Sequence, residues 1–253
     1  MEGAELAVFM MSACVFTVLL FHPMSPAVTA IPSEFARRAL TGMAMGLTAI
    51  VIVYSPWGQQ SGAHFNPSFT LTFWRLKKIN TPDAVFYVLS QFAGGIAGVG
   101  ISAAIFGSST LANSKVNYAV TLPGPKGVAL AFWAEALISF VLLFVVLIVS
   151  NRKALARYTP LFVGTLVALF ITFESPVSGM SMNPARTLGS AAFPRAWTSL
   201  WIYFTAPPLG MLLAAEVFVR LREAAPHCAK LHHHNSKRCI FHCAFEEFIS
   251  ETN

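Results

Sequence analysis

The chain has 253 residues, of which 55% are hydrophobic and 11% are charged, and its mean hydropathy is +0.62. Soluble domains carry about 25% charged residues, so this composition excludes a disordered chain, a nucleic-acid-binding module and most cytosolic enzymes. The net charge of +6 comes from short Lys and Arg clusters between apolar runs. That pattern is typical of the loops of a polytopic membrane protein.

Six stretches are apolar and long enough to cross a bilayer, because a hydrocarbon core about 30 Å thick needs roughly 20 helical residues. They are predicted at about 3–22, 35–56, 82–106, 127–150, 158–174 and 198–220. The fifth is short. The first is not expected to be a cleavable signal peptide, because its leader carries Glu2 and Glu5 and no basic residue.

The basic residues predict the orientation of these spans. Six crossings leave both termini on one side, where eleven Lys and Arg residues lie, against six on the other side. Positive charge collects in cytoplasmic loops. We therefore expect both termini in the cytoplasm and the protein in a plasma membrane or a bacterial inner membrane.

Two loop segments match each other at a shift of 117 residues. Residues 61–71 (SGAHFNPSFTL) and 178–188 (SGMSMNPARTL) are identical at six of eleven positions. They follow spans 2 and 5, so three crossings separate them and they enter from opposite faces. The sequence therefore predicts inverted halves at about 1–118 and 124–220, a plan that recurs in transporters and channels.

Each copy contains Asn followed by Pro, which are favoured at the N-cap and the first position of a helix. The helices that follow, at about 67–76 and 184–193, are too short to cross the membrane. We expect two re-entrant half-helices buried by protein. They would meet near the membrane centre with their N-termini facing each other.

Together these features resemble the aquaporin, or major intrinsic protein, family. The resemblance rests on the Asn-Pro-Ser and Asn-Pro-Ala-Arg motifs, on Gln91 with the two glycines after it, and on Tyr203 in span 6, and it covers about residues 3–220. It implies an all-α bundle of six spans and two half-helices around one pore. By analogy it also implies a homotetramer in the lipid bilayer.

The resemblance implies a passive channel for water that excludes ions and protons and also admits small uncharged solutes. One alternative is a facilitator for glycerol or metalloid acids. Two others are a proton-coupled carrier that uses Glu5 or Glu135, and a regulator dominated by a metal-sensing tail. No enzymatic reaction, no cofactor and no nucleic-acid partner are expected.

The resemblance also assigns site residues. The two motifs contribute Asn66, Pro67, Ser68, Asn183, Pro184 and Ala185. Their half-helix N-termini and Asn amides would form a central barrier to protons and cations. The expected selectivity filter contains Ile171, Met180, Arg186 and one of two residues of span 2. The local sequence match favours Met45, and counting back from Asn66 favours Gly46.

Three titratable residues within this region have two interpretations. Glu5 and Glu135 lie in apolar spans, where an unpaired charge is costly. We favour a supporting role, in which each accepts hydrogen bonds from the re-entrant loop of its own half, over a proton relay. His64 is a candidate pH-sensitive gate, although a fixed hydrogen bond is the favoured interpretation.

The tail, residues 221–253, lies outside the resemblance and holds five of the seven His and three of the four Cys residues. Such side chains suit zinc or copper. The Cys-x10-Cys-x3-Cys spacing is not a standard zinc pattern, so the sequence predicts a disordered basic tail and no metal site. The candidates for the alternative are His227, Cys228, His232, His233, His234, Cys239, His242 and Cys243.

Overall fold

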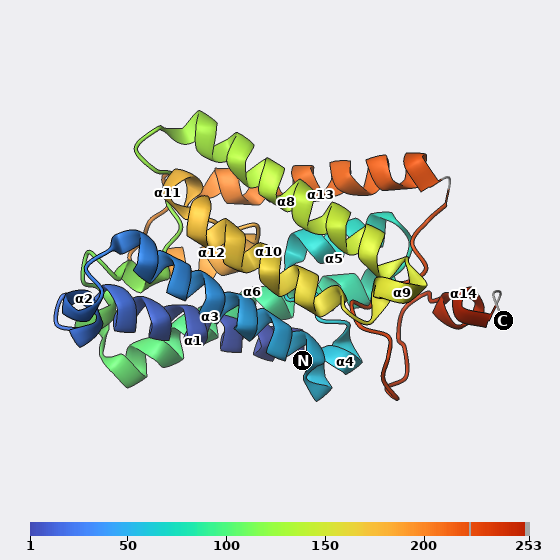
Figure 1. Ribbon diagram of the computed structural model, residues 1–253, viewed down its shortest axis with the longest axis horizontal. Coiled ribbons are helices and arrows are strands. Elements are labelled where there is room, and N and C mark those ends of the chain that lie inside the picture. Colours follow the sequence, from blue (N-terminus) through green and yellow to red (C-terminus); the bar gives the residue numbers. More distant parts are fainter. Residues whose placement is uncertain (223, 251–253) are drawn as a thin grey trace.

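Long helices run side by side and enclose two short ones in the computed structural model, which describes residues 1–222 and 224–250 (Figure 1). Within those residues there are helices and loops and no strand. The long helices are α1 (Glu2–Phe21), α3 (Glu34–Tyr54), α6 (Thr81–Phe106), α8 (Val128–Ser150), α10 (Thr159–Phe173) and α13 (Leu200–Arg222). The enclosed ones are α5 (Pro67–Arg75) and α12 (Pro184–Ala191).

The all-α fold that the sequence predicts is confirmed. Five of the six long helices are apolar and long enough to span a membrane. The exception is α10, whose 15 residues extend for about 22 Å. This matches the short fifth span expected from the sequence. Short elements connect the long helices: α2 (Pro26–Ala30), α4 (Pro56–Ser61), α7 (Ser108–Leu111), η1 (Asn117–Ala119), α9 (Lys153–Ala156) and α11 (Ser175–Ser178).

Glycines set the close approach of the long helices. A Cβ atom at Gly94 of α6 would overlap the backbone of Gly3 in α1. Likewise, a Cβ at Gly46 of α3 would overlap the carbonyl of Gly164 in α10. Small residues at such crossings let helix backbones pack closely in lipid, where apolar burial between helices gives little driving force.

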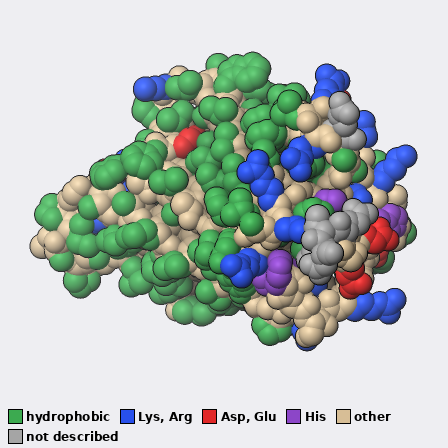
Figure 2. Space-filling model, turned by 45° about the vertical axis from the view of Figure 1, so that its right-hand side comes forward, with side chains coloured by type: hydrophobic (Ala, Val, Ile, Leu, Met, Phe, Trp, Pro, Cys, Tyr) green, Lys and Arg blue, Asp and Glu red, His purple; other side chains and the backbone are tan. Residues whose placement is uncertain are grey.

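The surface divides into an apolar body and a polar end. Blue, red and purple side chains gather on the right of Figure 2, around the tail, while green ones cover much of the rest of this face. Large side chains that remain exposed on the long helices include Leu47, Val51, Phe86, Leu89, Trp133, Leu137 and Leu213. An exposed apolar surface of this extent indicates a membrane environment.

The tail differs from the disordered segment expected from its composition. Its described part returns to the end of the bundle that carries α9, and it ends in α14 (Phe245–Ser250) (Figure 1). Ala229, Leu231 and Phe241 are buried there. We call this the tail-side end, and we call the end that carries α2 and α11 the far end.

Candidate pore

The two half-helices begin as their Asn-Pro motifs predict. The Asn66 side chain accepts a hydrogen bond from the Ser68 amide at 2.9 Å. The Asn183 side chain accepts from the amides of Ala185 and Arg186 at 3.0 and 3.1 Å. Proline stands at the first helical position in both, where its missing N–H removes no bond. In Figure 1, α5 lies toward the tail side and α12 toward the far end.

The two loops hold each other through a reciprocal pair of hydrogen bonds. The Asn66 amide donates to the Met182 carbonyl at 2.8 Å, and the Asn183 amide donates to the Phe65 carbonyl at 2.7 Å. Phe65 and Met182 are equivalent positions of the repeat. A side-chain amide carries two hydrogens, so each Asn retains one to donate into the space between the half-helices.

The loop backbones repeat the same uncommon conformation. Positive φ angles occur at the paired positions Ala63 and Met180 (57° and 52°) and at Phe65 and Met182 (32° and 55°). Non-glycine residues rarely adopt such angles and do so at a cost. The surrounding structure must therefore hold these loops in place.

Buried carboxylates hold both loops. Glu135 accepts hydrogen bonds from the Ser178 hydroxyl at 2.6 Å and from the Ser181 and Met182 amides at 2.7 Å each. In the first half the equivalent amides, those of His64 and Phe65, bond instead to Glu2, at 3.0 and 2.6 Å.

Sequence reasoning missed Glu2 as a loop-holding residue. Glu5, to which it assigned that role, accepts one bond, from the Ser61 hydroxyl at 2.7 Å. The first half therefore divides between Glu2 and Glu5 the contacts that Glu135 makes alone. The available signal was the spacing of the two acids, which lie three residues apart on one helix face.

A cavity of about 480 Å³ passes between the two motifs. Its lining includes Ser114 and Lys115 from the loop before η1 and Leu231 from the tail. One face of each of three helices contributes to the lining: Phe9, Ala13, Thr17 and Phe21 of α1, Arg38, Thr41 and Met45 of α3, and Val163, Val167 and Ile171 of α10. The spacing of three or four residues keeps each set on a single helix face.

The expected filter residues lie together, with one exception. Met45, Ile171, Met180 and Arg186 all line the cavity. Gly46 faces α10 at its close contact with Gly164 and is absent from the lining, so Met45 is the span 2 residue that faces the cavity. Nη1 of Arg186 is buried and has no hydrogen-bond partner among the residues that the structure describes.

The motif residues other than the two Asn serve the helix starts. Pro67, Ser68, Pro184 and Ala185 are buried at the N-termini of α5 and α12, and the Asn66 and Asn183 side chains line the cavity beside them. Ala185 packs against α6, where a Cβ atom at Gly95 would contact its carbonyl.

His64 lies at the tail-side end of the cavity with both ring nitrogens in hydrogen bonds. Nε2 is 3.0 Å from the Ala229 carbonyl and Nδ1 is 3.1 Å from the Thr70 hydroxyl. A carbonyl only accepts, so we assign the ring proton to Nε2. The ring also stacks on Phe73 and on Phe241 of the tail, so the tail fixes its orientation.

The sequence pattern described as "Major intrinsic protein" matches residues 4–218. A protein named aquaporin NIP2-3, from Zea mays, is 35% identical over 223 residues, which cover 87% of this chain and 71% of that protein. A probable aquaporin NIP-type from Nicotiana alata is 35% identical over 70% of this chain, and the match spans 63% of its length.

A bacterial relative and a solved structure extend the comparison. The glycerol uptake facilitator protein-like 6 of Lactiplantibacillus plantarum is 34% identical over 69% of this chain and 81% of its own length. The fold is similar to an X-ray structure of the aquaglyceroporin from Plasmodium falciparum, with a TM-score of 0.68 and 19% identity. That match covers 87% of this chain and 94% of the other.

Proposed function

Because the chain belongs to the major intrinsic protein family of membrane channels for water or small solutes, we propose that it conducts water and small uncharged solutes passively and excludes ions and protons. The observation that carries this proposal is the reciprocal bonding of the loops through Asn66 and Asn183, which both line the cavity. Members of the family are channels and not enzymes, so no reaction enters the mechanism.

The central exclusion of ions follows from the two half-helices. Each helix N-terminus carries a partial positive charge of about half an elementary charge. A permeating water accepts hydrogen bonds from the free amide hydrogens of Asn66 and Asn183, so its own hydrogens point away from the centre. A hydrogen-bonded file of waters cannot pass a proton through that reversal, and a cation meets a positive barrier.

The filter determines which neutral solutes pass. Three of its four side chains are apolar (Met45, Ile171 and Met180), and none is aromatic. Nη1 of Arg186, which has no partner among the described residues, can donate to a solute oxygen, and the charge of Arg186 repels cations. This composition supports a pore that accepts solutes larger than water. The name of one relative, a glycerol uptake facilitator protein, agrees with passage of such solutes.

The hydrogen bonds of Glu135 and Glu5 favour a channel over a proton-coupled carrier. A proton relay requires a carboxylate that exchanges protons along a pathway. Both Glu135 oxygens instead hold loop groups, and Glu5 and Glu135 are absent from the cavity lining among the described residues. We assign both to the support of the re-entrant loops, together with Glu2.

The same proposal includes the orientation and the assembly. Lys and Arg side chains surround the tail in Figure 2, which supports a cytoplasmic tail-side end. We assign residues 1–220 to the channel, in two inverted halves, and residues 221–253 to a cytoplasmic tail. We place the protein in a plasma or bacterial inner membrane as a homotetramer by analogy with the family.

Stopped-flow light scattering of proteoliposomes tests the proposed permeability. Under a sucrose gradient the vesicles are expected to shrink several-fold faster than protein-free vesicles. Under a glycerol gradient they are expected to shrink and then re-swell rapidly. Shrinkage without rapid re-swelling would restrict the channel to water. A rate equal to that of bare liposomes in both gradients would contradict the proposal.

Replacing Arg186 with Val is expected to raise glycerol permeability several-fold, because the change widens the filter and removes its only charge. The Arg152→Val variant is the matched control: it makes the same change at an exposed residue that is absent from the cavity lining and whose extended backbone accepts valine. The re-swelling rate in glycerol measures the effect. Equal rates for Arg186→Val and wild type would remove Arg186 from the filter.

A further inference from the structure

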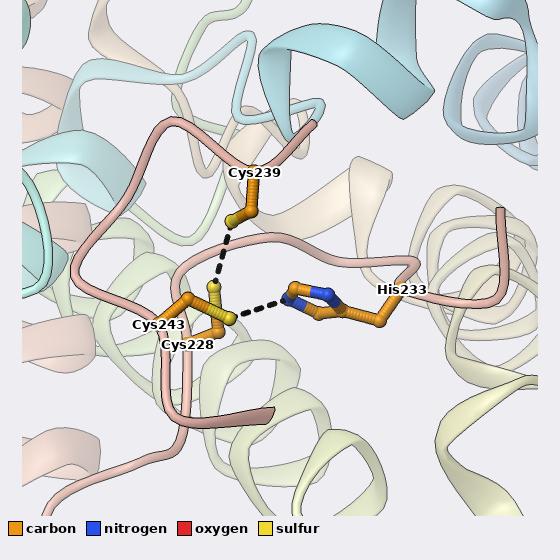
Figure 3. Close-up of side chains that lie close together, drawn as sticks. All are labelled: Cys228, His233, Cys239 and Cys243. Atoms are coloured by element: carbon orange, nitrogen blue, oxygen red, sulfur yellow. Dashed lines mark hydrogen bonds between the residues drawn. The ribbon is translucent and has the colours of Figure 1, made fainter. Parts of the chain in front are cut away.

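Three thiols and one imidazole of the tail converge on one point, although their spacing in the sequence is irregular (Figure 3). The group consists of Cys228, His233, Cys239 and Cys243, and its four ligand atoms all lie within 4.8 Å of one another. All three cysteines are free thiols. None of the four residues takes part in the proposed pore, so the cluster needs a separate explanation.

The distances in the cluster fit a tetrahedral metal ion. With Zn–S bonds of about 2.3 Å and Zn–N bonds of about 2.0 Å, a tetrahedron places two sulfurs about 3.8 Å apart and a sulfur and a nitrogen about 3.5 Å apart. Sγ of Cys228 lies 3.5 Å from Sγ of Cys239. Sγ of Cys243 lies 3.7 Å from Nε2 of His233.

The surrounding chain holds these side chains in position. Lys230 closes the turn that carries His233, because its ammonium donates to the Asn235 side chain and to the Lys237 carbonyl, each at 3.2 Å. Its backbone amide donates to Sγ of Cys228 at 3.5 Å. The His233 ring stacks on Phe245 at 4.3 Å, which fixes its plane. A buried ammonium and an amide donor both stabilise thiolates.

We propose that Cys228, His233, Cys239 and Cys243 bind one Zn²⁺ ion, and that this site holds the tail as a cap over the tail-side mouth of the pore. Three thiolates and one imidazole form a complete ligand set for a structural zinc site, which has no open position for catalysis. Zinc binds the deprotonated thiols, so binding releases their protons to solvent. The site requires a reducing compartment, such as the cytoplasm.

The ligands and the pore are joined by the segment between them. Residues 229–231 lie between Cys228 and His233 in the sequence. Within that segment the Ala229 carbonyl bonds to His64, and the Leu231 amide donates to the Gly62 carbonyl at 3.2 Å. The Leu231 side chain lines the cavity. A metal ion that holds this segment therefore holds the residues that cover the tail-side mouth of the pore. Removal of the metal is expected to release the segment and to open the mouth.

Metal content tests the site without any transport measurement. The full chain, purified with a tag that lacks histidine, is expected to contain about one zinc ion. Cys239→Ser and His233→Ala are expected to lose it, whereas the matched controls Cys14→Ser and His234→Ala retain it. Equal zinc in the variants and their controls, or no stoichiometric zinc in wild type, would overturn the site.

Cobalt titration of the metal-stripped wild-type chain tests the ligand set even where a variant fails to fold. Tetrahedral thiolate coordination is expected to produce visible d–d bands and thiolate-to-Co²⁺ charge-transfer bands, both abolished by excess Zn²⁺. Octahedral spectra without charge-transfer bands would contradict the ligand set.

The proposal that the tail caps the pore rests on the proposed function, and a permeability measurement tests this cap. A membrane-permeant zinc chelator is expected to raise water permeability of wild-type proteoliposomes several-fold and to leave the Cys239→Ser variant, already open, unchanged. Permeability that the chelator does not change, in a chain that binds zinc, would overturn the cap. If no preparation conducts water, the proposed function fails, and the zinc content still decides the site.

Discussion

Replacing Glu135 with glutamine is expected to abolish permeability and to destabilise the fold by about 3 kcal/mol or more. Glu135 is fully buried, and its two oxygens accept three hydrogen bonds, one from the Ser178 hydroxyl at the end of α11 and two from amides of the loop before α12. Glutamine offers one oxygen, and its amide nitrogen points a donor at a group that also donates. An orphaned buried donor costs about 1–3 kcal/mol, and bonds to a charged acceptor are worth more than neutral ones. Thermal unfolding in detergent and shrinkage in sucrose measure the two effects.

The first half of the repeat supplies the control for this prediction. Glu2 accepts two loop amides and the Gln91 side chain, so Glu2→Gln is expected to approach the effect of Glu135→Gln. Glu5 accepts a single hydroxyl, and its Oε2 has no partner among the described residues, so Glu5→Gln is expected to be much milder. A Glu5 variant that is less stable than the Glu2 variant would contradict this division of roles.

The long helices and the half-helices could be predicted because their signals are local. Apolar runs identify the spans, and Asn followed by Pro identifies a helix start without any tertiary information. The inverted arrangement of the two halves could be predicted from the internal repeat, because its two matching segments are separated by three crossings. The predicted half-helices end only one or two residues beyond those of the structure.

The sequence left two candidates for the span 2 filter residue, because the local match within the span favours Met45 whereas the count from Asn66, which passes through a loop, favours Gly46. Counting back from Asn66 assumes that the connection through α4 has the family's length, and one extra residue shifts the result. The local match within α3 avoids this, because helical periodicity fixes which face a residue occupies. Gly46 instead supports the crossing of α3 and α10.

The partners of Glu2 and the grouping of four tail residues into one cluster could not be predicted, because tertiary contacts define them. The partners of Glu2 lie 62 and 63 positions away in the sequence. The tail ligands have no regular spacing, because contacts with the bundle, and not a short zinc loop, bring them together. One such contact is the hydrogen bond from the His242 amide to the Lys78 carbonyl.

Replacing Asn183 with aspartate is expected to preserve the fold and to open the pore to protons and cations. Asp caps a helix about as well as Asn, so α12 should form. The carboxylate, however, cannot donate to the Phe65 carbonyl as the amide does at 2.7 Å. Its unit charge also offsets the positive potential of two helix N-termini, each equivalent to about half an elementary charge. A pH-sensitive dye inside proteoliposomes measures the resulting proton flux.

We expect that flux to rise at least about tenfold, which corresponds to a barrier lower by only about 1.4 kcal/mol. The equivalence of the two halves predicts the same result for Asn66→Asp, whose amide donates to the Met182 carbonyl. Asn80→Asp is the matched control, because Asn80 begins α6 outside the cavity, is exposed and makes no side-chain cap. If all three variants leak equally, the barrier is not set by charge at the motifs. If Asn183→Asp alone leaks, the two half-helices do not contribute equally, and the far-end half carries the exclusion of ions.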